Sequence, residues 1–460
     1  MSQQLPHALI ASLQTVKGFD EEDFVRMHQS GEQVTSIRLN PRKTFNVERS
    51  TLNVHGGVPW SSNGYYLAER PLFTIDPLFH AGAYYVQEAS SMFLEEAVKQ
   101  TCDLSKPLKV LDLCAAPGGK STLLQSIISN ESLLVSNEVI KSRVNILSEN
   151  ITKWGAANVV VTNNDPKDFQ RLPEYFDVIV IDAPCSGSGL FRKDPEAITE
   201  WSVDNVMLCS QRQQRILADI LPSLKPGGIL IYSTCSYSKE EDELICDWLL
   251  SNIQDPISST RLQTTSTWNI TETNSPQHNA FGYRFYPDKL KGEGFFIAAF
   301  KKEGTITFSK EVKTRNKPDS VSKAEMEVLN PLIKNAGSFS FFKWQETIIA
   351  VPAKLLHDVF VLQSVLYLKK AGIKIGSIIR NELIPDHEFA LSDLTTDKIH
   401  PVEVDTANAL QYLRRADIDI KKDHKGWALV MYKGLALGWI KILPNRINNY
   451  YPAEWRILNK

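Results

Sequence analysis

The chain has 460 residues, of which 43% are hydrophobic and 23% charged, and its formal net charge is −2. A length above the roughly 250 to 300 residues that one core supports predicts two or three domains, and this hydrophobic content excludes a wholly disordered protein. The near-neutral total also argues against a protein that coats nucleic acid through bulk positive charge.

The N-terminal segment lacks the basic stretch and apolar run of a secretory signal, and no run of about 18 apolar residues occurs along the chain. We therefore expect a cytosolic protein with no membrane span. The cysteines are too few for a disulfide scaffold and show no CxxC spacing, so reduced thiols and no metal site are predicted. They are Cys102, Cys114, Cys185, Cys209, Cys235 and Cys246.

Residues 1–70 form an N-terminal extension with a predicted helix from about Leu9 to Met27, followed by the segment TSIRLNPRKT. Residues 71–302 alternate short apolar runs with longer amphipathic ones. KVLDLCA, LLVSNE, NVVVTNND, FDVIVIDAP and PGGILIYSTCS are the predicted strands, and Lys239 to Leu250 is a predicted helix. Strands that alternate with helices predict right-handed βαβ units, and hence a Rossmann-like α/β domain with a doubly wound, mostly parallel sheet.

The polar stretch 303–320 is typical of a linker. Beyond it, strand-like runs return, which predicts an accessory α+β domain at 321–395 and a last, mainly β domain at 396–460. From His400 to Lys460 there are ten Lys plus Arg against six Asp plus Glu. This local excess indicates either a polyanionic partner or simply a solvated face.

A glycine-containing turn follows the first predicted strand of the α/β domain. Small residues there let a ligand approach the backbone, and the N–H groups of the following helix favour an anionic or carboxylate group. The turn runs through Cys114, Ala115, Ala116, Pro117, Gly118, Gly119 and Lys120. A P-loop lacks its first glycine here, and the dinucleotide fingerprint G-x-G-x-x-G is absent, so the pattern favours another nucleotide or amino-acid moiety.

Two acidic residues close the next two predicted strands. Glu138 stands about 20 residues after the turn, where an acid binds the ribose of adenosine-containing cofactors. Asp165 ends the strand NVVVTNND and is placed to reach an adenine amino group. The alternative for either residue is a helix N-cap, which needs no ligand.

Two further strands each end in a loop that carries a cysteine. Asp182 and Cys185 follow FDVIVIDAP, and Cys235 follows PGGILIYST, so both thiols should converge at the edge where open α/β sheets bind ligands. The other four cysteines are interpreted as inert, small hydrophobic residues.

A pair of thiols at a ligand site has a chemical use in covalent catalysis. A thiolate that adds to C6 of cytosine turns C5 into a nucleophile for a methyl group. Lys120 would lower the pKa of the thiol, and Asp182 would face N3 of the base.

The motifs LDLCAAPGGK, NEVIKSRV, NNDPKDF, DAPCSGSG, STCSYS and RFYPDKLKGEGFFIA occur in this order and closely resemble those of the RNA 5-methylcytosine methyltransferases of Sun/NSUN type. The resemblance covers about Ser36 to Phe300. It implies a class I methyltransferase fold, S-adenosylmethionine as cofactor, Cys235 as nucleophile and Cys185 as the thiol that aids product release. The implied cofactor contacts are Cys114, Ala115, Ala116, Pro117, Gly118, Gly119, Lys120, Glu138, Arg143, Asp165 and Asp182.

The C-terminal stretch resembles the PUA-like module of a bacterial branch of this family that methylates 16S ribosomal RNA. This implies 16S ribosomal RNA or the small ribosomal subunit as partner, with the chain acting as a monomer. Basic and aromatic residues in the module suit phosphate contact and base stacking, although the aromatic ones are also interpretable as the core of a small β domain. They are Trp427, Tyr432, Lys433, Trp439, Lys441, Arg446, Tyr450 and Tyr451.

Two segments ahead of the α/β core complete the resemblance. Arg38, Asn40 and Arg42 in SIRLNPRK are expected to touch the RNA backbone, although surface solvation is an alternative for Arg42. The resemblance places Tyr84, Gln87, Ser90 and Ser91 near the substrate base, whereas the residues alone predict a helix there.

Other functions stay open on the sequence. An NAD-linked dehydrogenase would explain the βαβ pattern and Glu138 but not the paired cysteines, and a non-catalytic RNA-binding factor would explain the basic C-terminal stretch. Within the main hypothesis, transfer RNA or 23S ribosomal RNA is an alternative substrate. The roles of the cysteines are also open to reversal, because DNA cytosine-5 methyltransferases attack with the Pro-Cys thiol, here Cys185.

Overall fold

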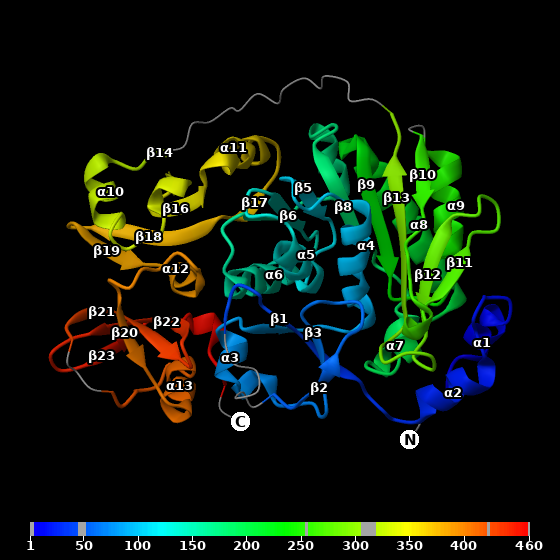
Figure 1. Cartoon of the computed structure of the whole chain (residues 1–460), viewed down its shortest axis with the longest axis horizontal. Helices are drawn as coiled ribbons and strands as arrows, with labels where there is room; N and C mark the ends of the chain where they lie inside the picture. Colours follow the sequence, from blue (N-terminus) through cyan, green and yellow to red (C-terminus); the bar gives the residue numbers. More distant parts are fainter. Residues whose placement is uncertain (1–3, 45–51, 254–255, 305–318, 421–423, 459–460) are drawn as a thin grey trace.

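The structure is a computed structural model that describes residues 4–44, 52–253, 256–304, 319–420 and 424–458. Most of the predicted linker, 303–320, lies outside the described residues. The described residues form four sheets. Figure 1 shows the largest of them on one side of the molecule and the three smaller sheets beside and below it.

The N-terminal region is two helices followed by a small sheet. The helix predicted from Leu9 to Met27 is interrupted, because the chain turns at Gly18 with φ +85° between α1 (His7–Leu13) and α2 (Glu21–Gln29). The sheet has the antiparallel order β2-β3-β1-β4, and it extends past the predicted domain boundary at residue 70. Its strands are β1 (Thr35–Leu39), β2 (Val54–Gly57), β3 (Gly64–Leu67) and β4 (Tyr84–Val86), with α3 (Pro77–His80) before β4.

The central sheet has the order β11-β12-β13-β9-β8-β5-β6-β7-β17, and β10 pairs with β13. The five inner strands are parallel, and the chain leaves β5 first toward β6 and β7 and then returns to β8 on the other side. The predicted doubly wound α/β fold is confirmed. The strands are β5 (Lys109–Asp112), β6 (Leu133–Asn137), β7 (Val159–Thr162), β8 (Phe176–Asp182), β9 (Leu224–Thr234), β10 (Ile257–Thr260), β11 (Thr271–Asn274), β12 (Phe281–Phe285) and β13 (Phe295–Lys302).

Helices cover both faces of this sheet. Within β8, Ile179 and Ile181 pack toward α8 and α9, whereas Val178 and Val180 pack toward α5 and α6. Alternating side chains therefore bury both faces, as expected for parallel strands. The helices are α4 (Leu94–Thr101), α5 (Gly119–Ile127), α6 (Lys141–Trp154), α7 (Glu196–Glu200), α8 (Val203–Ile220) and α9 (Glu243–Asn252), so the helix predicted from Lys239 starts four residues later.

The region predicted as an accessory domain shares the central sheet. Its strand β17 (Leu368–Ala371) pairs antiparallel with β7, and its helix α11 (Leu356–Val365) adds apolar residues to the core over β8. The rest forms a separate sheet of order β14-β15-β16-β18-β19. Its other elements are β14 (Asp319–Ser320), α10 (Lys323–Leu329), β15 (Phe339–Trp344), β16 (Thr347–Pro352), β18 (Ile373–Ile379), β19 (Glu382–Pro385) and α12 (His387–Leu391).

The C-terminal module packs on the N-terminal sheet. Its order is β20-β21-β22-β23, and Tyr412, Leu437 and Tyr451 share a hydrophobic core with Ile37 and Tyr84 of the N-terminal region. Figure 1 shows this module beside α3. Its elements are β20 (His400–Glu403), α13 (Thr406–Leu413), β21 (Gly426–Tyr432), β22 (Leu435–Ile442) and β23 (Ile447–Asn449).

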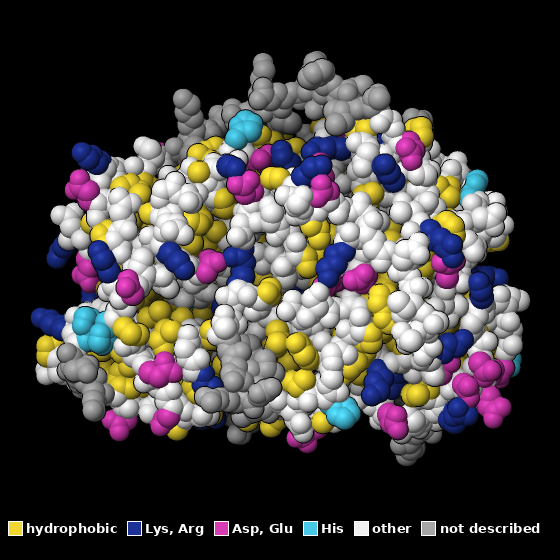
Figure 2. All heavy atoms as spheres, viewed as in Figure 1, with side chains coloured by type: hydrophobic (Ala, Val, Ile, Leu, Met, Phe, Trp, Pro, Cys, Tyr) yellow, Lys and Arg dark blue, Asp and Glu magenta, His cyan; other side chains and the backbone are white. Residues whose placement is uncertain are grey.

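The molecular surface carries mixed charge. On the face shown in Figure 2, Lys and Arg side chains alternate with Asp and Glu side chains, in keeping with a net charge of −2. Specific sites, and not a broad positive field, must therefore select any anionic ligand on this face. None of the helices among the described residues is long and apolar enough to cross a membrane.

Candidate active site

A cavity of about 350 Å³ opens at the carboxyl ends of β5, β8 and β9. This is the place where the chain reverses direction from β5, which is where open α/β sheets bind ligands. A larger cavity, of about 490 Å³, lies beside Arg42 and Asp393, and its lining residues include no thiol. The smaller cavity is lined by Tyr85, Val86, Gln87, Glu88, Ser91, Cys114, Ala115, Ala116, Pro117, Gly119, Lys120, Asp182, Leu190, Cys235, Glu293, Gly294 and Phe295.

The glycine-containing turn forms one wall of this cavity. Gly118 adopts φ +119° at the start of α5, a conformation that favours glycine. Two side chains from α6 fix the turn: Arg143 donates to the Ala116 carbonyl at 2.6 Å, and Asn150 donates to the Pro117 carbonyl at 2.8 Å. The first N–H groups of α5 thus face a cavity with small residues along its wall, which fits a ligand that carries a carboxylate.

The two acids predicted for the cofactor are not among the residues that line the cavity. Glu138 is buried, accepts a hydrogen bond from the Ile140 N–H at 2.8 Å, and lies 3.6 Å from Arg143. Asp165 caps the 3₁₀ helix Pro166–Arg171 and lies 3.5 Å from Arg215, so it has the capping role that the sequence left as an alternative.

Asp112, at the end of β5, is an ionisable residue that the sequence reasoning missed. Its Oδ2 accepts a hydrogen bond from Ser121 at 2.7 Å, and its Oδ1 has no hydrogen-bond partner within the described chain. Burial raises the pKa of Asp112 to about 7. A strand that ends in an acid directly before a glycine-rich turn was the available signal.

Lys120 and Asp182 form an ion pair in the cavity. The Lys120 Nζ lies 2.8 Å from Asp182 Oδ2, and Ser233 donates to the other oxygen at 3.0 Å. Burial lowers the pKa of Lys120, but the carboxylates of Asp182 and Asp112 outweigh it and raise the pKa. Lys120 is therefore a fixed positive charge beside the thiols.

The two predicted cysteines are in contact, and Cys235 lines the cavity, whereas Cys185 is not among its lining residues. The Sγ atoms of Cys185 and Cys235 are 2.9 Å apart, although 50 residues separate them along the chain. The contact with Cys235, followed by burial, raises the pKa of the Cys185 thiol well above its usual value. At neutral pH the Cys185 thiol is therefore protonated, and its sulfur is in hydrogen-bonding contact with the sulfur of Cys235.

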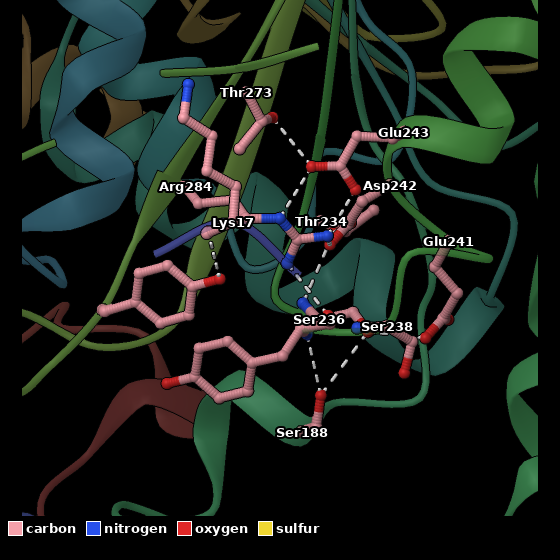
Figure 3. Close-up of polar contacts among 12 residues, drawn as sticks. Lys17, Ser188, Thr234, Ser236, Ser238, Glu241, Asp242, Glu243, Thr273 and Arg284 are labelled. Carbon is pink, nitrogen blue, oxygen red and sulfur yellow. Dashed lines mark hydrogen bonds and ion pairs between the residues drawn. The ribbon is translucent and has the colours of Figure 1, made fainter. Parts of the chain in front are cut away.

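A buried acidic side chain braces both cysteine loops, and the sequence reasoning missed it too. Glu241 accepts hydrogen bonds from Ser186 and Ser236, the residues directly after Cys185 and Cys235. Figure 3 shows Glu241 beside Ser236 at the edge of a cluster in which Arg284 lies between Glu243 and Asp242.

The opposite wall of the cavity comes from the segment around β4. Gln87 and Ser91 line the cavity, and Glu88 accepts hydrogen bonds from the N–H groups of Ser90, Ser91 and Glu293 at 2.8 to 2.9 Å. The residues alone predicted a helix here, whereas the structure has a strand and a 3₁₀ turn. Tyr84 does not line the cavity; it is buried and donates to Asp76 at 2.7 Å.

The expectation that Arg38 and Asn40 touch RNA is wrong, because both are buried, with exposed fractions of 1% and 2%. The Arg38 guanidinium donates to Gln87 at 2.9 Å and to carbonyls in the first turns of α5. Asn40 donates to the Gly82 and Trp154 carbonyls. Arg42 is ion-paired to Asp393 at 2.6 Å, so the segment joins modules to one another.

The remaining four cysteines differ in their surroundings. Cys209 and Cys246 are buried, and burial raises the pKa of their thiols and that of Cys102. Cys114 lines the cavity, and burial also raises the pKa of its thiol. Among the described residues, no group of three or more His, Cys, Asp or Glu is arranged to hold a metal ion.

The aromatic residues of the C-terminal module divide into core and surface. Tyr432, Trp439 and Tyr451 are buried. Trp427 and Tyr450 stand together, with ring centroids 4.5 Å apart, and the Lys441 ammonium lies 5.1 Å from the Trp427 ring. Tyr450 also lines an open groove of about 690 Å³, together with Arg415, Arg446, Asn445 and Asn448.

Comparison with known families gives three matches that together span most of the chain. Residues 100–301 match the family described as 16S rRNA methyltransferase RsmB/F. Residues 5–89 match the N-terminal domain of 16S rRNA methyltransferase RsmF, and residues 400–457 match the methyltransferase RsmF PUA domain. The predicted PUA-like module and N-terminal extension are therefore confirmed as parts of the fold.

Individual relatives agree with these matches. The chain is 33% identical over 412 residues to ribosomal RNA small subunit methyltransferase F of Aeromonas salmonicida, with coverage of 86% of this chain and 84% of the relative. It is 30% identical to the protein of the same name from Vibrio parahaemolyticus, with coverage of 98% and 97%.

Solved structures resemble about two thirds of the chain. A methyltransferase homolog protein from Pyrococcus horikoshii is 28% identical, with a TM-score of 0.51 and coverage of 65% of this chain and 100% of that one. NSun6 from Pyrococcus horikoshii with SFG is 19% identical, with a TM-score of 0.53 and coverage of 65% and 99%, and shows the same fold.

Proposed function

This chain belongs to the RsmB/F family of 16S ribosomal RNA methyltransferases, and we propose that it methylates carbon 5 of a cytosine in 16S ribosomal RNA through a covalent cysteine adduct. Family membership removes the dehydrogenase and the non-catalytic alternatives. The observation that carries the proposal is the 2.9 Å separation of the Cys185 and Cys235 sulfur atoms, with Cys235 lining the same cavity as the Lys120–Asp182 ion pair.

We propose S-adenosylmethionine as the methyl donor. The residues fit it: α5 presents free N–H groups to a carboxylate, the turn from Cys114 to Lys120 is lined with small residues, and Asp112 offers an unpartnered oxygen among the described residues. The sulfonium supplies an electrophilic methyl group when it is bound. Arg143 and Asn150 fix the position of the turn, and Glu138 lies 3.6 Å from Arg143; Glu138 and Asp165 are the acids that we propose for the adenosine part of the donor.

The first chemical step is addition of the Cys235 sulfur to C6 of the cytosine. The S–C6 bond forms, the C5–C6 double bond opens, and negative charge spreads over the ring toward C5 and N3. Lys120 and Asp182 are the groups in the cavity that can place positive charge or a proton beside N3. C5 then takes the methyl group with the electron pair of the opened double bond, and the methyl–sulfur bond of the donor would break to leave a neutral thioether.

Release reverses the addition. A base removes the C5 proton, the electron pair restores the C5–C6 double bond, and Cys235 leaves as a thiolate. We assign Cys185 as the acid that gives its proton to the departing sulfur, because its raised pKa keeps it protonated and its sulfur lies 2.9 Å from that of Cys235. The reverse assignment, with Cys185 as nucleophile, would require a thiol whose pKa is raised well above its usual value to ionise.

The partner we propose is 16S ribosomal RNA or the small subunit, with the protein acting as a cytosolic monomer. The C-terminal module, 396–460, would bind RNA, with Trp427, Tyr450 and the arginines of the adjoining groove at hand for stacking and phosphate contact. The target base must leave its stack to reach the cavity, which costs a few kcal/mol and less in a loop. Transfer RNA and 23S ribosomal RNA remain as alternative substrates.

Trapping tests the chemistry directly. In RNA that carries 5-fluorocytosine, C5 bears a fluorine in place of the proton that must leave before Cys235 is released. An adduct that forms in the presence of S-adenosylmethionine should therefore survive denaturing electrophoresis. Cys235→Ala should form none, and Cys185→Ala should accumulate adduct even on unmodified RNA. Bisulfite mapping of ribosomal RNA from a strain that lacks the protein identifies the cytosine. The absence of any adduct with the authentic target would overturn the covalent mechanism.

A further inference from the structure

We propose that Glu241 is a positioning residue that holds the two cysteine loops at the separation the reaction needs. The carboxylate is buried, and it does not line the cavity, so its effect must pass through the loops. The proposal rests on the proposed function for its catalytic meaning, although the geometry that it explains is independent of any substrate.

The hydrogen bonds of this carboxylate reach both loops. Glu241 Oε1 accepts from the Ser186 N–H at 2.8 Å and from Gln213 at 3.3 Å. Its Oε2 accepts from the hydroxyl of Ser186 at 2.5 Å and from that of Ser236 at 2.6 Å. One side chain therefore binds the residue directly after each thiol.

The strands alone do not fix the thiols. Asp182 ends β8 three residues before Cys185, so that loop needs a brace of its own, whereas Cys235 directly follows the last residue of β9. Two backbone hydrogen bonds join the Cys185 loop to the end of β9 and the start of the Cys235 loop, from the Ala183 N–H to the Ser233 carbonyl at 2.8 Å and from the Gly189 N–H to the Cys235 carbonyl at 2.9 Å. Next to Cys185 itself, Ser186 contacts the Ser236 hydroxyl at 3.4 Å, and Glu241 binds both of these serines.

Glu241 is in turn held from the sheet and from the neighbouring helix. Tyr232 of β9 donates to the Glu241 carbonyl at 2.7 Å, and Gln213 of α8 donates both to its carboxylate and to the Pro184 carbonyl. The buried Arg284, which pairs with Glu243, donates to the Tyr237 carbonyl two residues beyond Cys235 (Figure 3). The Glu241 carboxylate is therefore held in one position, and its hydrogen bonds to Ser186 and Ser236 fix the positions of both thiols.

The thiol separation is measurable without RNA. Diamide oxidises two neighbouring thiols to a disulfide: each thiol gives up a proton and one electron, and the N=N bond of the reagent is reduced to a hydrazine. We expect Glu241→Ala to slow formation of the Cys185–Cys235 disulfide about tenfold, as followed by mass spectrometry of digests. Glu241→Gln should stay within about threefold of the native chain, because its amide oxygen accepts from the Ser186 N–H and its NH₂ donates to the two hydroxyls.

The matched control is Asp247→Ala. Asp247 is also a buried carboxylate close in sequence, but it accepts hydrogen bonds from Ser275, Gln277 and His278, away from the thiols. This variant loses stability without a change in the oxidation rate. If Glu241→Ala does not fold, Ser186→Ala and Ser236→Ala each remove one donor and should slow disulfide formation about twofold to threefold.

In single-turnover methylation, Glu241→Ala should lower the rate of adduct formation at saturating RNA while KM for RNA stays unchanged. Native-like rates of disulfide formation in folded Glu241→Ala, or in both serine variants, would overturn the proposal. A different result separates the two proposals. If Glu241→Ala forms the Cys185–Cys235 disulfide slowly but the native chain forms no adduct with RNA, the positioning role stands and the proposed function is refuted.

Discussion

The guanidinium of Arg38 donates a hydrogen bond to Gln87 Oε1 at 2.9 Å, which joins a strand of the N-terminal sheet to a residue that lines the candidate active-site cavity. The same guanidinium reaches the Gly119 and Thr122 carbonyls and lies 4.6 Å from the Trp154 ring. One buried cation thus connects strand β1, the start of α5 and a wall of the candidate active-site cavity.

Arg38→Met should destabilise the protein by roughly 2–4 kcal/mol, since several buried acceptors would lose their donor. Denaturant unfolding measures this effect. Arg42→Met, which removes a partly exposed ion pair with Asp393, should cost about 1 kcal/mol or less. Because Arg38 is buried, its loss should leave the salt dependence of RNA binding unchanged, and a reduced salt slope would restore the RNA-contact interpretation.

Lys120→Met should lower the single-turnover rate of methylation on the order of 10²-fold, because it removes the fixed positive charge beside the thiols. Adduct formation with 5-fluorocytosine RNA should fall in parallel. The control is Lys109→Met, since Lys109 is also partly buried and ion-paired, at 2.5 Å from Asp358, but lies outside the cavity. Equal losses in both variants would mean that the effect is one of folding.

Asp112 should give a recognisable pH dependence of stability. Its pKa is about 7 in the folded protein, whereas an unfolded Asp titrates near pH 3.9, so the folded state binds the proton more tightly. The contribution of Asp112 to stability is therefore full below about pH 4 and declines as the pH rises to about 7. Asp112→Asn should remove this decline, as read from urea unfolding at several pH values; an unchanged profile would show that Asp112 is ionised when folded.

The groove of the C-terminal module provides a test of RNA contact. Arg446 lines it, and Arg446→Ala should weaken RNA binding and reduce the slope of log K against log salt by about 1. Arg456→Ala is the control in the same module. Among the hydrogen bonds described, Arg456 donates only to the carbonyl of Ala453, three residues earlier in the chain. Filter binding over a salt series measures both slopes, and equal slopes would place the RNA elsewhere.

Local patterns predicted much of the fold and of the site. The strand-turn-helix order around Gly118 and the two cysteine loops are features of contiguous sequence, and parallel strands bring such loops to one edge. The burial of Arg38 was not predictable in this way, because its partners are residues 87 to 126. Glu241 was missed for the same reason, since its partners come from two loops and a helix.

The pairing of β17 with β7 has a consequence for the newly made chain. Until Leu368–Ala371 has left the ribosome, β7 is a bare edge whose N–H and C=O groups can pair with any extended segment. About 200 residues are synthesised in that interval, which is many seconds at 5–20 residues per second. A fragment that stops before β17 should accordingly aggregate. In the intact protein, β17, which is made late in synthesis, covers the exposed edge of β7, which is made early.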